Sequence, residues 1–251
     1  KIIKLSYIFS TNVKILLDII TTIIIQRILM IVEQHKLDVS VHGAGKTQEF
    51  KMKASAKSFS IMMDGLYSNK IAAVIRELAS NATDSHQLAG CPEKPFHIKM
   101  PNSIDPTFRI RDYGVGLSEE DMFNIYTTFF ESTKEDSNDF TGFLGLGSKA
   151  FFSVTDSANI TSYFNGVKTV YVAYLNPSRI PSLSTFSSMP TEEENGIEIE
   201  VAIKKNEISY FRDEVNKQLK YFKVKPVITG DSQFQWNLDE EYLYTGTNWK
   251  M

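Results

Sequence analysis

KIAAVIRELASNATDSHQLA, residues 70–89, is the stretch of sequence that decides the fold. Its apolar residues recur at the spacing of an α-helix and share one face: Ile71, Val74, Ile75, Leu78 and Ala82. Ser68 or Asn69 can cap the start of such a helix, and Gly90, with Pro92 beyond it, can end it. The stretch therefore predicts one long amphipathic helix.

A narrow polar stripe lies beside that apolar face, because Glu77, Asn81 and Asp84 follow one another at i, i+4 and i+7. Three polar residues alone are typical of a solvated helix face. Chemistry offers a second interpretation. The Glu77 carboxylate can take a proton from water, and the Asn81 amide oxygen can bind a hard cation such as Mg²⁺. Mg²⁺ uses few protein oxygens, so Asn81 together with nucleotide phosphates could hold it.

Two alternating segments, 96–100 and 107–111, predict paired strands, and the second ends in Asp112-Tyr113-Gly114-Val115-Gly116. Asp-rich turns after strands are common, so this motif alone is weak. Its chemistry suits a base-binding site, however. Gly114 and Gly116 would let the backbone approach a flat ring, and a buried Asp112 could accept a hydrogen bond from an adenine amino group.

A polar segment, 131–139, leads into a glycine-rich one, Thr141-Gly142-Phe143-Leu144-Gly145-Leu146-Gly147. The polar segment is typical of a mobile lid or of a plain solvated loop. The glycine-rich segment precedes SKAFFSV, which favours a helix, so it offers free amides and the positive end of a helix dipole to phosphates.

Taken in order, these four motifs resemble the GHKL superfamily of ATPases, which includes gyrase B, MutL and the ninety-kilodalton heat-shock chaperones. Residues 77–84 resemble its N-box, in which the Glu is the general base and the Asn binds Mg²⁺. The histidine kinases of this superfamily do not use such a Glu to activate water, so Glu77 favours hydrolysis. The resemblance also implies that Asp112 selects adenine. Further nucleotide contacts would come from Asp84, Gly114, Gly116, Lys134 of the lid's Ser-Thr-Lys, and Gly142, Gly145 and Gly147.

The fourth box of the superfamily departs from the usual pattern. Asn195-Gly196-Ile197 supplies the glycine before a closing strand, but Ile197 stands where the superfamily usually has Thr. An isoleucine has no hydroxyl to support the adenine-side Asp. This departure concerns the adenine contact and leaves the expected phosphate and Mg²⁺ sites unchanged.

Residues 30–225 most resemble the rIIA-type rapid-lysis proteins of tailed phages, which are much longer than this chain. We expect an ATP-binding domain at 30–225 and the start of a truncated, transducer-like domain at 226–251. The expected function is Mg²⁺-dependent ATP binding with slow hydrolysis, and an ATP-dependent homodimer and a phage or host protein partner are compatible with it. The alternatives are a nucleotide-gated binding module without significant hydrolysis and a membrane-associated phage accessory protein.

The expected fold class is α/β, a two-layer sandwich of a mixed, mostly antiparallel sheet with helices on one face, of the Bergerat type. Asn165-Gly166 predicts a tight hairpin. The expected strands lie near 96–100, 107–111, 158–163, 167–175 and 196–203. The expected helices lie near 70–89, 118–130, 147–155 and 207–221.

Residues 1–29 differ in composition from the rest, and Val13 to Val32 is rich in Ile. This segment is either a membrane helix, which Asp18 and Arg27 oppose, or a non-native leader before a natural start at Met30. Membrane association is expected only if residues 1–29 are native. A single cysteine, Cys91, fits a reducing cytoplasm, in the host if a phage encodes the protein, and the net charge of -3 does not indicate nucleic-acid binding.

Gly43-Ala44-Gly45-Lys46-Thr47 is similar to the end of a phosphate-binding P-loop, but it lacks the first glycine of that motif. The flanking segments, 37–42 and 48–61, alternate polar and apolar residues. They predict two strands around a glycine-rich turn rather than a loop that opens a helix.

Overall fold

The computed structural model describes residues 55–128, 147–237, 245–246 and 249–250. The chain divides into two compact units, Lys1–Lys51 and Met52–Met251, and every described residue belongs to the second. The lid residue Lys134, the glycines Gly142 and Gly145, and the segment 37–42 lie outside the described residues.

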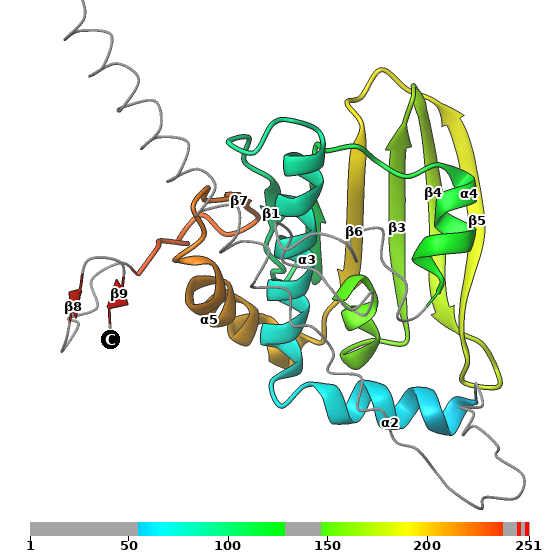
Figure 1. The fold of residues 1–251 in the computed structure, drawn as a ribbon. Coiled ribbons are helices and arrows are strands. Elements are labelled where there is room, and N and C mark those ends of the chain that lie inside the picture. Colours follow the sequence, from blue (N-terminus) through cyan, green and yellow to red (C-terminus); the bar gives the residue numbers. More distant parts are fainter. Residues whose placement is uncertain (1–54, 129–146, 238–244, 247–248, 251) are drawn as a thin grey trace, which may run out of the picture. The chain divides into compact units, whose positions relative to one another are not determined.

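A seven-stranded sheet forms one layer of the second unit, in the order β5-β4-β3-β6-β2-β1-β7 (Figure 1). Neighbouring strands are antiparallel except β1 and β7, which are parallel. The strands are β1 (His97–Lys99), β2 (Thr107–Arg111), β3 (Ser157–Phe164), β4 (Val167–Leu175), β5 (Pro181–Pro190), β6 (Gly196–Ala202) and β7 (Val227–Thr229). The mixed, mostly antiparallel sheet is confirmed, and the sequence did not predict β5 and β7. A separate pair joins β8 (Thr245–Gly246) to β9 (Trp249–Lys250).

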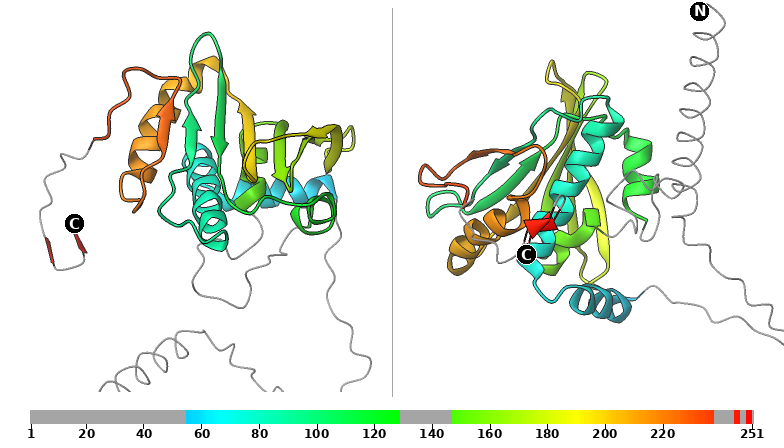
Figure 2. Two further views of the ribbon diagram at one scale, coloured as in Figure 1. Left: turned by 90° about the horizontal axis from the view of Figure 1, so that it is seen from above. Right: turned by 60° about the vertical axis from the view of Figure 1, so that its left-hand side comes forward.

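Helices form the second layer and cover one face of the sheet, as the views in Figure 2 show. They are α2 (Ala56–Leu66), α3 (Lys70–Leu88), α4 (Glu119–Asp121) continued by the π-helical turn η1 (Met122–Tyr126), the 3₁₀ helices η2 (Gly147–Ser153) and η3 (Lys205–Glu207), and α5 (Ile208–Leu219). The α/β two-layer sandwich predicted from the sequence is therefore confirmed.

Helix α3 crosses the middle of the sheet and begins as the sequence predicts. The Asn69 side chain accepts a hydrogen bond from the Ala72 amide at 3.0 Å, so one of the unpaired amides of the first turn is satisfied. The helix ends at Leu88, and Gly90 follows in the left-handed conformation with φ of +73°.

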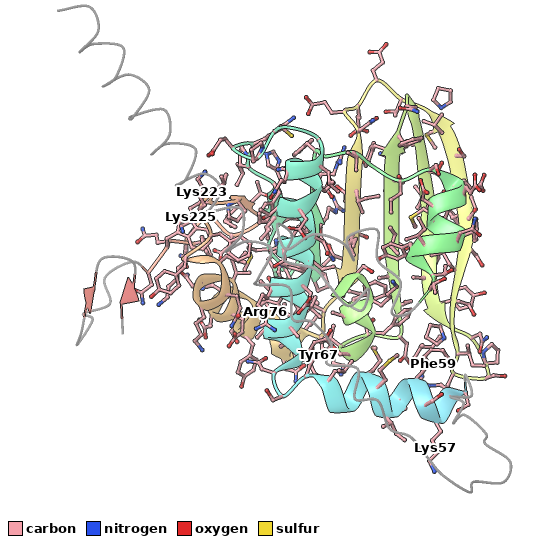
Figure 3. The ribbon with its side chains drawn as sticks, viewed as in Figure 1. Lys57, Phe59, Tyr67, Arg76, Lys223 and Lys225 are labelled. Atoms are coloured by element: carbon pink, nitrogen blue, oxygen red, sulfur yellow. The ribbon has the colours of Figure 1, made fainter. Side chains whose placement is uncertain are left out.

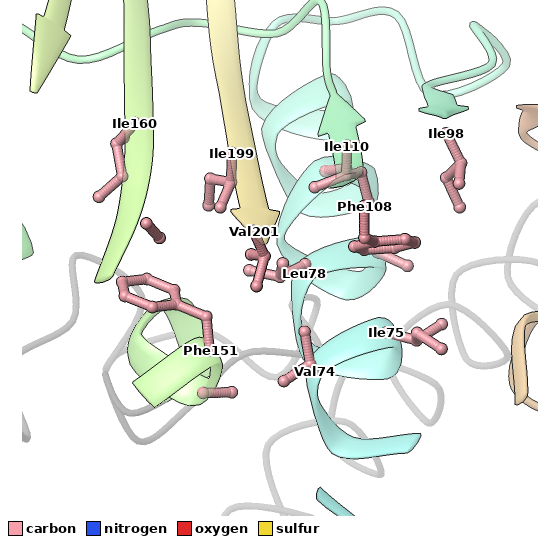
Figure 4. Packing of buried hydrophobic residues seen from close by; sticks show 14 of the residues in the cluster. Val74, Ile75, Leu78, Ile98, Phe108, Ile110, Phe151, Ile160, Ile199 and Val201 are labelled. Atoms are coloured by element: carbon pink, nitrogen blue, oxygen red, sulfur yellow. The ribbon is translucent and has the colours of Figure 1, made fainter. Parts of the chain in front are cut away.

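The core lies between α3 and the sheet (Figure 4). Val74, Ile75 and Leu78 of α3 are buried against alternate residues of the central strands. These strand residues include Ile98, Phe108, Ile110, Ile160, Ile199 and Val201, and Phe151 of η2 closes the cluster at one side. Because strand side chains alternate between faces, this register leaves the other face polar. There Arg109 of β2 donates to Glu200 of β6 through Nε at 2.9 Å.

The strand predicted for the second half of 48–61 is wrong, because α2 begins at Ala56. Ser55 caps this helix: its hydroxyl accepts from the Ser58 amide at 3.2 Å, and the Ser58 hydroxyl accepts from the Ser55 amide at 2.8 Å. Phe59, Met62, Met63 and Leu66 recur at three- and four-residue spacing, which is the period of a helix.

Two further helices are shorter or tighter than expected. The helix predicted at 118–130 starts at its capping Ser118 but continues as a π-helical turn that ends at Tyr126. The helix predicted at 147–155 is a 3₁₀ helix, Gly147–Ser153. Across the described ranges, no helix is both long enough and apolar enough to cross a membrane.

Leu78→Ala should lower the free energy of unfolding by about 2–5 kcal/mol, because Leu78 is 2% exposed and its truncation leaves a cavity under the sheet. Urea denaturation followed by circular dichroism measures the change. Leu88→Ala on the same helix is the control, since Leu88 is 49% exposed and its truncation should cost about 0.5 kcal/mol or less. Equal losses in the two variants would contradict this assignment of the core.

Candidate functional site

The polar stripe of α3 lies beside its buried face, as the helical period predicts. Glu77 and Asn81 are half-buried, and Asp84 is 1% exposed. An aspartate so deeply buried is uncommon and does not fit a simple solvated face.

Tyr67 and Arg76 lie near the corner where α2 meets α3 (Figure 3), and both are neighbours of Glu77. The Arg76 guanidinium is 3.5 Å from the Glu77 carboxylate, but it is more than half exposed, so water screens the pair. Burial, and then the negative charge of Glu77, raise the pKa of the Tyr67 phenol. Tyr67 therefore stays neutral and can act as a hydrogen-bond donor near the Glu77 carboxylate.

Gly147 of η2 packs directly against Glu77. A Cβ atom at position 147 would overlap the Glu77 carboxylate and lie 3.3 Å from its Cβ, so a larger residue there would require the Glu77 side chain to move. Of the three predicted glycines of this segment, Gly147 is the one that the structure describes. Its contact brings the end of the glycine-rich motif to the first residue of the N-box-like motif.

The two described ends of the segment that spans 129–146 are bonded to each other. The Tyr126 hydroxyl donates to the Ser148 carbonyl at 2.8 Å, and the buried Lys149 amine donates to the Thr128 carbonyl at 3.0 Å. These two bonds cross between η1 and η2. They fix where the chain leaves the described fold and where it re-enters it, at Gly147 next to Glu77.

Asp112 follows β2 and its carboxylate is buried. Oδ1 accepts hydrogen bonds from the Ser85 hydroxyl at 3.1 Å and from the Gly114 amide at 2.9 Å. Oδ2 accepts from the Ile197 amide at 3.2 Å. A carboxylate has about four acceptor positions, so Oδ2 keeps room for one more donor.

Burial raises the pKa of Asp112 to about 6, although hydrogen bonds from Gly114 and Ser85, the positive charge of Arg111, and the Ile197 amide oppose the rise. The folded pKa is above the unfolded value, so this group favours folding at low pH and that contribution is lost as the pH rises through about 6. At neutral pH the fold therefore retains an ionised carboxylate that lowers its stability. Such groups cluster at functional sites.

Ser85 and the backbone of Ile197 are parts of this site that the sequence did not indicate. Ile197 has no side-chain hydroxyl, as noted above, but its amide donates to Asp112 and its carbonyl accepts from the Asp112 amide at 2.9 Å. The hydroxyl donor comes from Ser85 on α3 instead. The Ile197 side chain does not make the hydrogen bond that a Thr would supply, and the Ile197 amide and the Ser85 hydroxyl donate to the Asp112 carboxylate instead.

The glycines of the turn after β2 are held against neighbouring backbone. Any Cβ at Gly114 would overlap the side chain and carbonyl of Ser85. The turn can therefore pack on the last turns of α3 only because Gly114 has no side chain. Gly116 lies against the backbone of Tyr163. Next to it, Leu117 exchanges hydrogen bonds with the Ser162 hydroxyl, which fastens the end of the turn to β3.

Helix α3 therefore contacts both halves of the predicted site, Gly147 through Glu77 and the Asp112 turn through Ser85. At about 1.5 Å per residue, Glu77 and Ser85 are separated by about 12 Å along the helix axis. Within 55–128 and 147–237, no three His, Cys, Asp or Glu side chains are grouped as metal ligands.

Comparison of the chain with protein-family models and with curated proteins gives no match.

Ser85→Ala should raise the pKa of Asp112 further above about 6, because it removes a hydrogen bond to the charged form. The rise should be about one pH unit or less, the equivalent of one hydrogen bond. Carbon-detected NMR titration of the side-chain carboxyl measures it. Thr83→Ala is the control, since the Thr83 hydroxyl bonds to Ala79 on the same helix. An unchanged Asp112 pKa in Ser85→Ala would contradict the bond.

Proposed function

We propose that this chain binds ATP together with Mg²⁺ and hydrolyses it slowly, through a Bergerat-type site of the GHKL superfamily. The observation that carries the proposal is the double contact of α3, which meets the Asp112 turn near its end and Gly147 at Glu77. These two contacts are separated by about 12 Å along the helix axis.

The adenine ring would bind at Asp112. The free acceptor position on Oδ2 suits the adenine amino group, and the three amide and hydroxyl donors keep the carboxylate ionised and oriented. The adenine amino group would give specificity, because a base without it would leave the remaining acceptor position of Oδ2 without a donor. This favours adenine over bases that present a carbonyl at the same place.

The phosphates would lie toward Glu77 and Gly147, with Asn81 one turn along α3 from Glu77. Since the described residues hold no acidic metal cluster, a cation at Asn81 would complete its coordination with phosphate oxygens and water, as Mg²⁺ prefers. Bound Mg²⁺ would neutralise phosphate charge. Glu77, half-buried and next to Gly147, would take the proton from the attacking water.

Glu77→Ala should leave the affinity for an ATP analogue within about threefold of the original and lower the rate of hydrolysis by about 10²–10⁴, because it removes a general base but no binding group. A single-turnover assay with radiolabelled ATP measures the rate, and calorimetry measures the affinity. Glu93→Ala, an exposed ion-pair partner of Lys223, is the control and should change neither.

An unchanged rate in Glu77→Ala would contradict the base assignment. If the original protein binds the analogue but shows no hydrolysis in a single turnover, the chain is a nucleotide-gated binding module.

Asp112→Asn should weaken binding of the ATP analogue by about tenfold or more, because its NH2 group would face a backbone amide that itself donates, that of Gly114 at the Oδ1 position or that of Ile197 at the Oδ2 position. Calorimetry at about pH 8, where Asp112 is ionised, measures the loss. Asp156→Asn is the control: Asp156 is an exposed partner of Arg179, so this change should leave the affinity for the ATP analogue unchanged. Retained affinity in a folded Asp112→Asn protein would contradict the adenine assignment.

A further inference from the structure

His86 lies in the last turn of α3, directly after Ser85, and its side chain is buried. Its Nδ1 lies 2.8 Å from the Lys94 carbonyl, and its Nε2 lies 2.7 Å from the Tyr113 amide. A carbonyl only accepts and an amide only donates. Nδ1 must therefore carry the hydrogen and Nε2 must be bare, so the ring is neutral and in a single tautomer.

The Tyr113 amide belongs to the same turn as the Asp112 carboxylate. Ser85 bonds that carboxylate and His86 bonds the following amide, so two successive residues of α3 hold two successive residues of the turn. Gly114 then packs on Ser85. A shift of the Tyr113 amide would move the peptide that connects it to Asp112.

The charged groups around the ring oppose its protonation. Burial lowers the pKa of His86 below its ordinary value; the hydrogen bond to the Lys94 carbonyl counteracts this, and the positive charges of Lys94 and Arg111 add to the decrease. Lys94 and Arg111 lie over the Tyr113 ring, at 4.8 and 4.7 Å from its centroid.

Further titratable side chains lie around Tyr113 or on the same turn of α3. The Tyr113 hydroxyl is 3.0 Å from Nδ1 of His97, and Glu194 pairs with Lys94 at 2.5 Å. The Cys91 thiol contacts the Tyr113 carbonyl at 3.9 Å, and Asp84 is buried on α3 two residues before His86.

We propose that His86 is a positioning residue for the nucleotide: its neutral ring fixes the turn that carries Asp112, and uptake of a proton by the ring releases that turn and weakens nucleotide binding in mildly acidic solution. This rests on the proposed function of the Asp112 site. The proton would go to Nε2, where the new N–H would face the Tyr113 N–H, so the hydrogen bond would become a contact between two donors.

The direction of the pH effect follows from the lowered pKa. The neutral ring stabilises the turn fully above the ordinary histidine pKa of about 6.5, and the contribution is lost as the pH falls through the lower pKa of the folded protein. Asp112 and the nucleotide phosphates also titrate near this range. The effect of His86 must therefore be measured against His86→Gln, which retains Asp112 and binds the same nucleotide phosphates.

The experiment measures binding of a non-hydrolysable ATP analogue with Mg²⁺ by calorimetry, at about pH 8 and about pH 5.5, for the original protein, His86→Gln and His86→Phe. The Gln carbonyl can accept from the Tyr113 amide and does not titrate, whereas Phe fills the space without an acceptor. At about pH 8 we expect His86→Gln to bind within about threefold of the original and His86→Phe to bind about tenfold more weakly.

At about pH 5.5 the original protein should lose affinity relative to His86→Gln by less than about tenfold, because the pKa of its ring lies below the ordinary value of about 6.5 and this limits proton uptake at that pH. His97→Gln is the control: His97 meets Tyr113 through the hydroxyl rather than the amide, so this variant should keep the pH profile of the original. A constant ratio of dissociation constants between the original and His86→Gln over this pH range would overturn the proposal. So would full affinity in a folded His86→Phe protein.

A second measurement separates failure of this proposal from failure of the proposed function. If the original protein does not bind the analogue at about pH 8, the ATP assignment fails, and His86 is tested without nucleotide by NMR. We then expect the Nδ1–H tautomer, and a Tyr113 amide whose exchange protection factor falls by about tenfold with decreasing pH in the original but not in His86→Gln. An Nε2–H tautomer, or a Tyr113 protection factor that does not respond to pH, would overturn the inference.

Discussion

The packing of the apolar face of α3 onto the sheet is the constraint on which the rest of the structure depends. Val74, Ile75 and Leu78 fix the rotation of the helix about its axis, because each further residue turns it by about 100°. Once that rotation is set, Glu77 and Ser85 have no freedom to face elsewhere. The hydrophobic core therefore determines the direction of polar groups that take no part in it.

Buried polar groups are concentrated at the turn after β2, where the fold satisfies each with a defined partner. Arg111 is 6% exposed, and its guanidinium lies over the Tyr163 ring at 3.9 Å from the centroid. It donates to the Glu194 carbonyl at 2.6 Å and also to the Asp112 carbonyl. Removing one partner of such a network would leave the others unpaired in a low dielectric, which costs free energy. The turn is therefore held in one arrangement.

Periodicity, together with cap and turn residues, predicted most of the fold. The helix at 70–89 and the strands at 107–111 and 167–175 match α3, β2 and β4 closely, since each has a long stretch of one period. The alternation around Ser55 to Ile61 gave a wrong prediction because so short a segment fits both the period of a strand and that of a helix. The capping box at Ser55 starts a helix there. Strand β5, Ser-rich and with few strong strand formers, depends on its pairing with β4, which a local pattern does not contain.

The candidate site was predictable where a motif fixes spacing along one element and unpredictable where it depends on contact between elements. The positions of Glu77, Asn81 and Asp112 follow from such motifs. The roles of Ser85 and the Ile197 amide follow only from the contacts that the turn makes in the folded protein. A serine or a backbone amide in the sequence does not indicate which group it will bond. A serine next to the polar stripe, on the turn of α3 that approaches Gly114, is the signal that could have identified Ser85.

The crossed bonds between Tyr126 and Ser148 and between Lys149 and Thr128 have an evolutionary consequence. They anchor both stems of the intervening segment independently of its content, and the entropy of closing a loop grows by only about 0.6 kcal/mol for each doubling of its length. Insertions and deletions between these stems are therefore nearly neutral for folding. Changes of length in that segment are therefore limited by the nucleotide contacts proposed for it rather than by the stability of the fold.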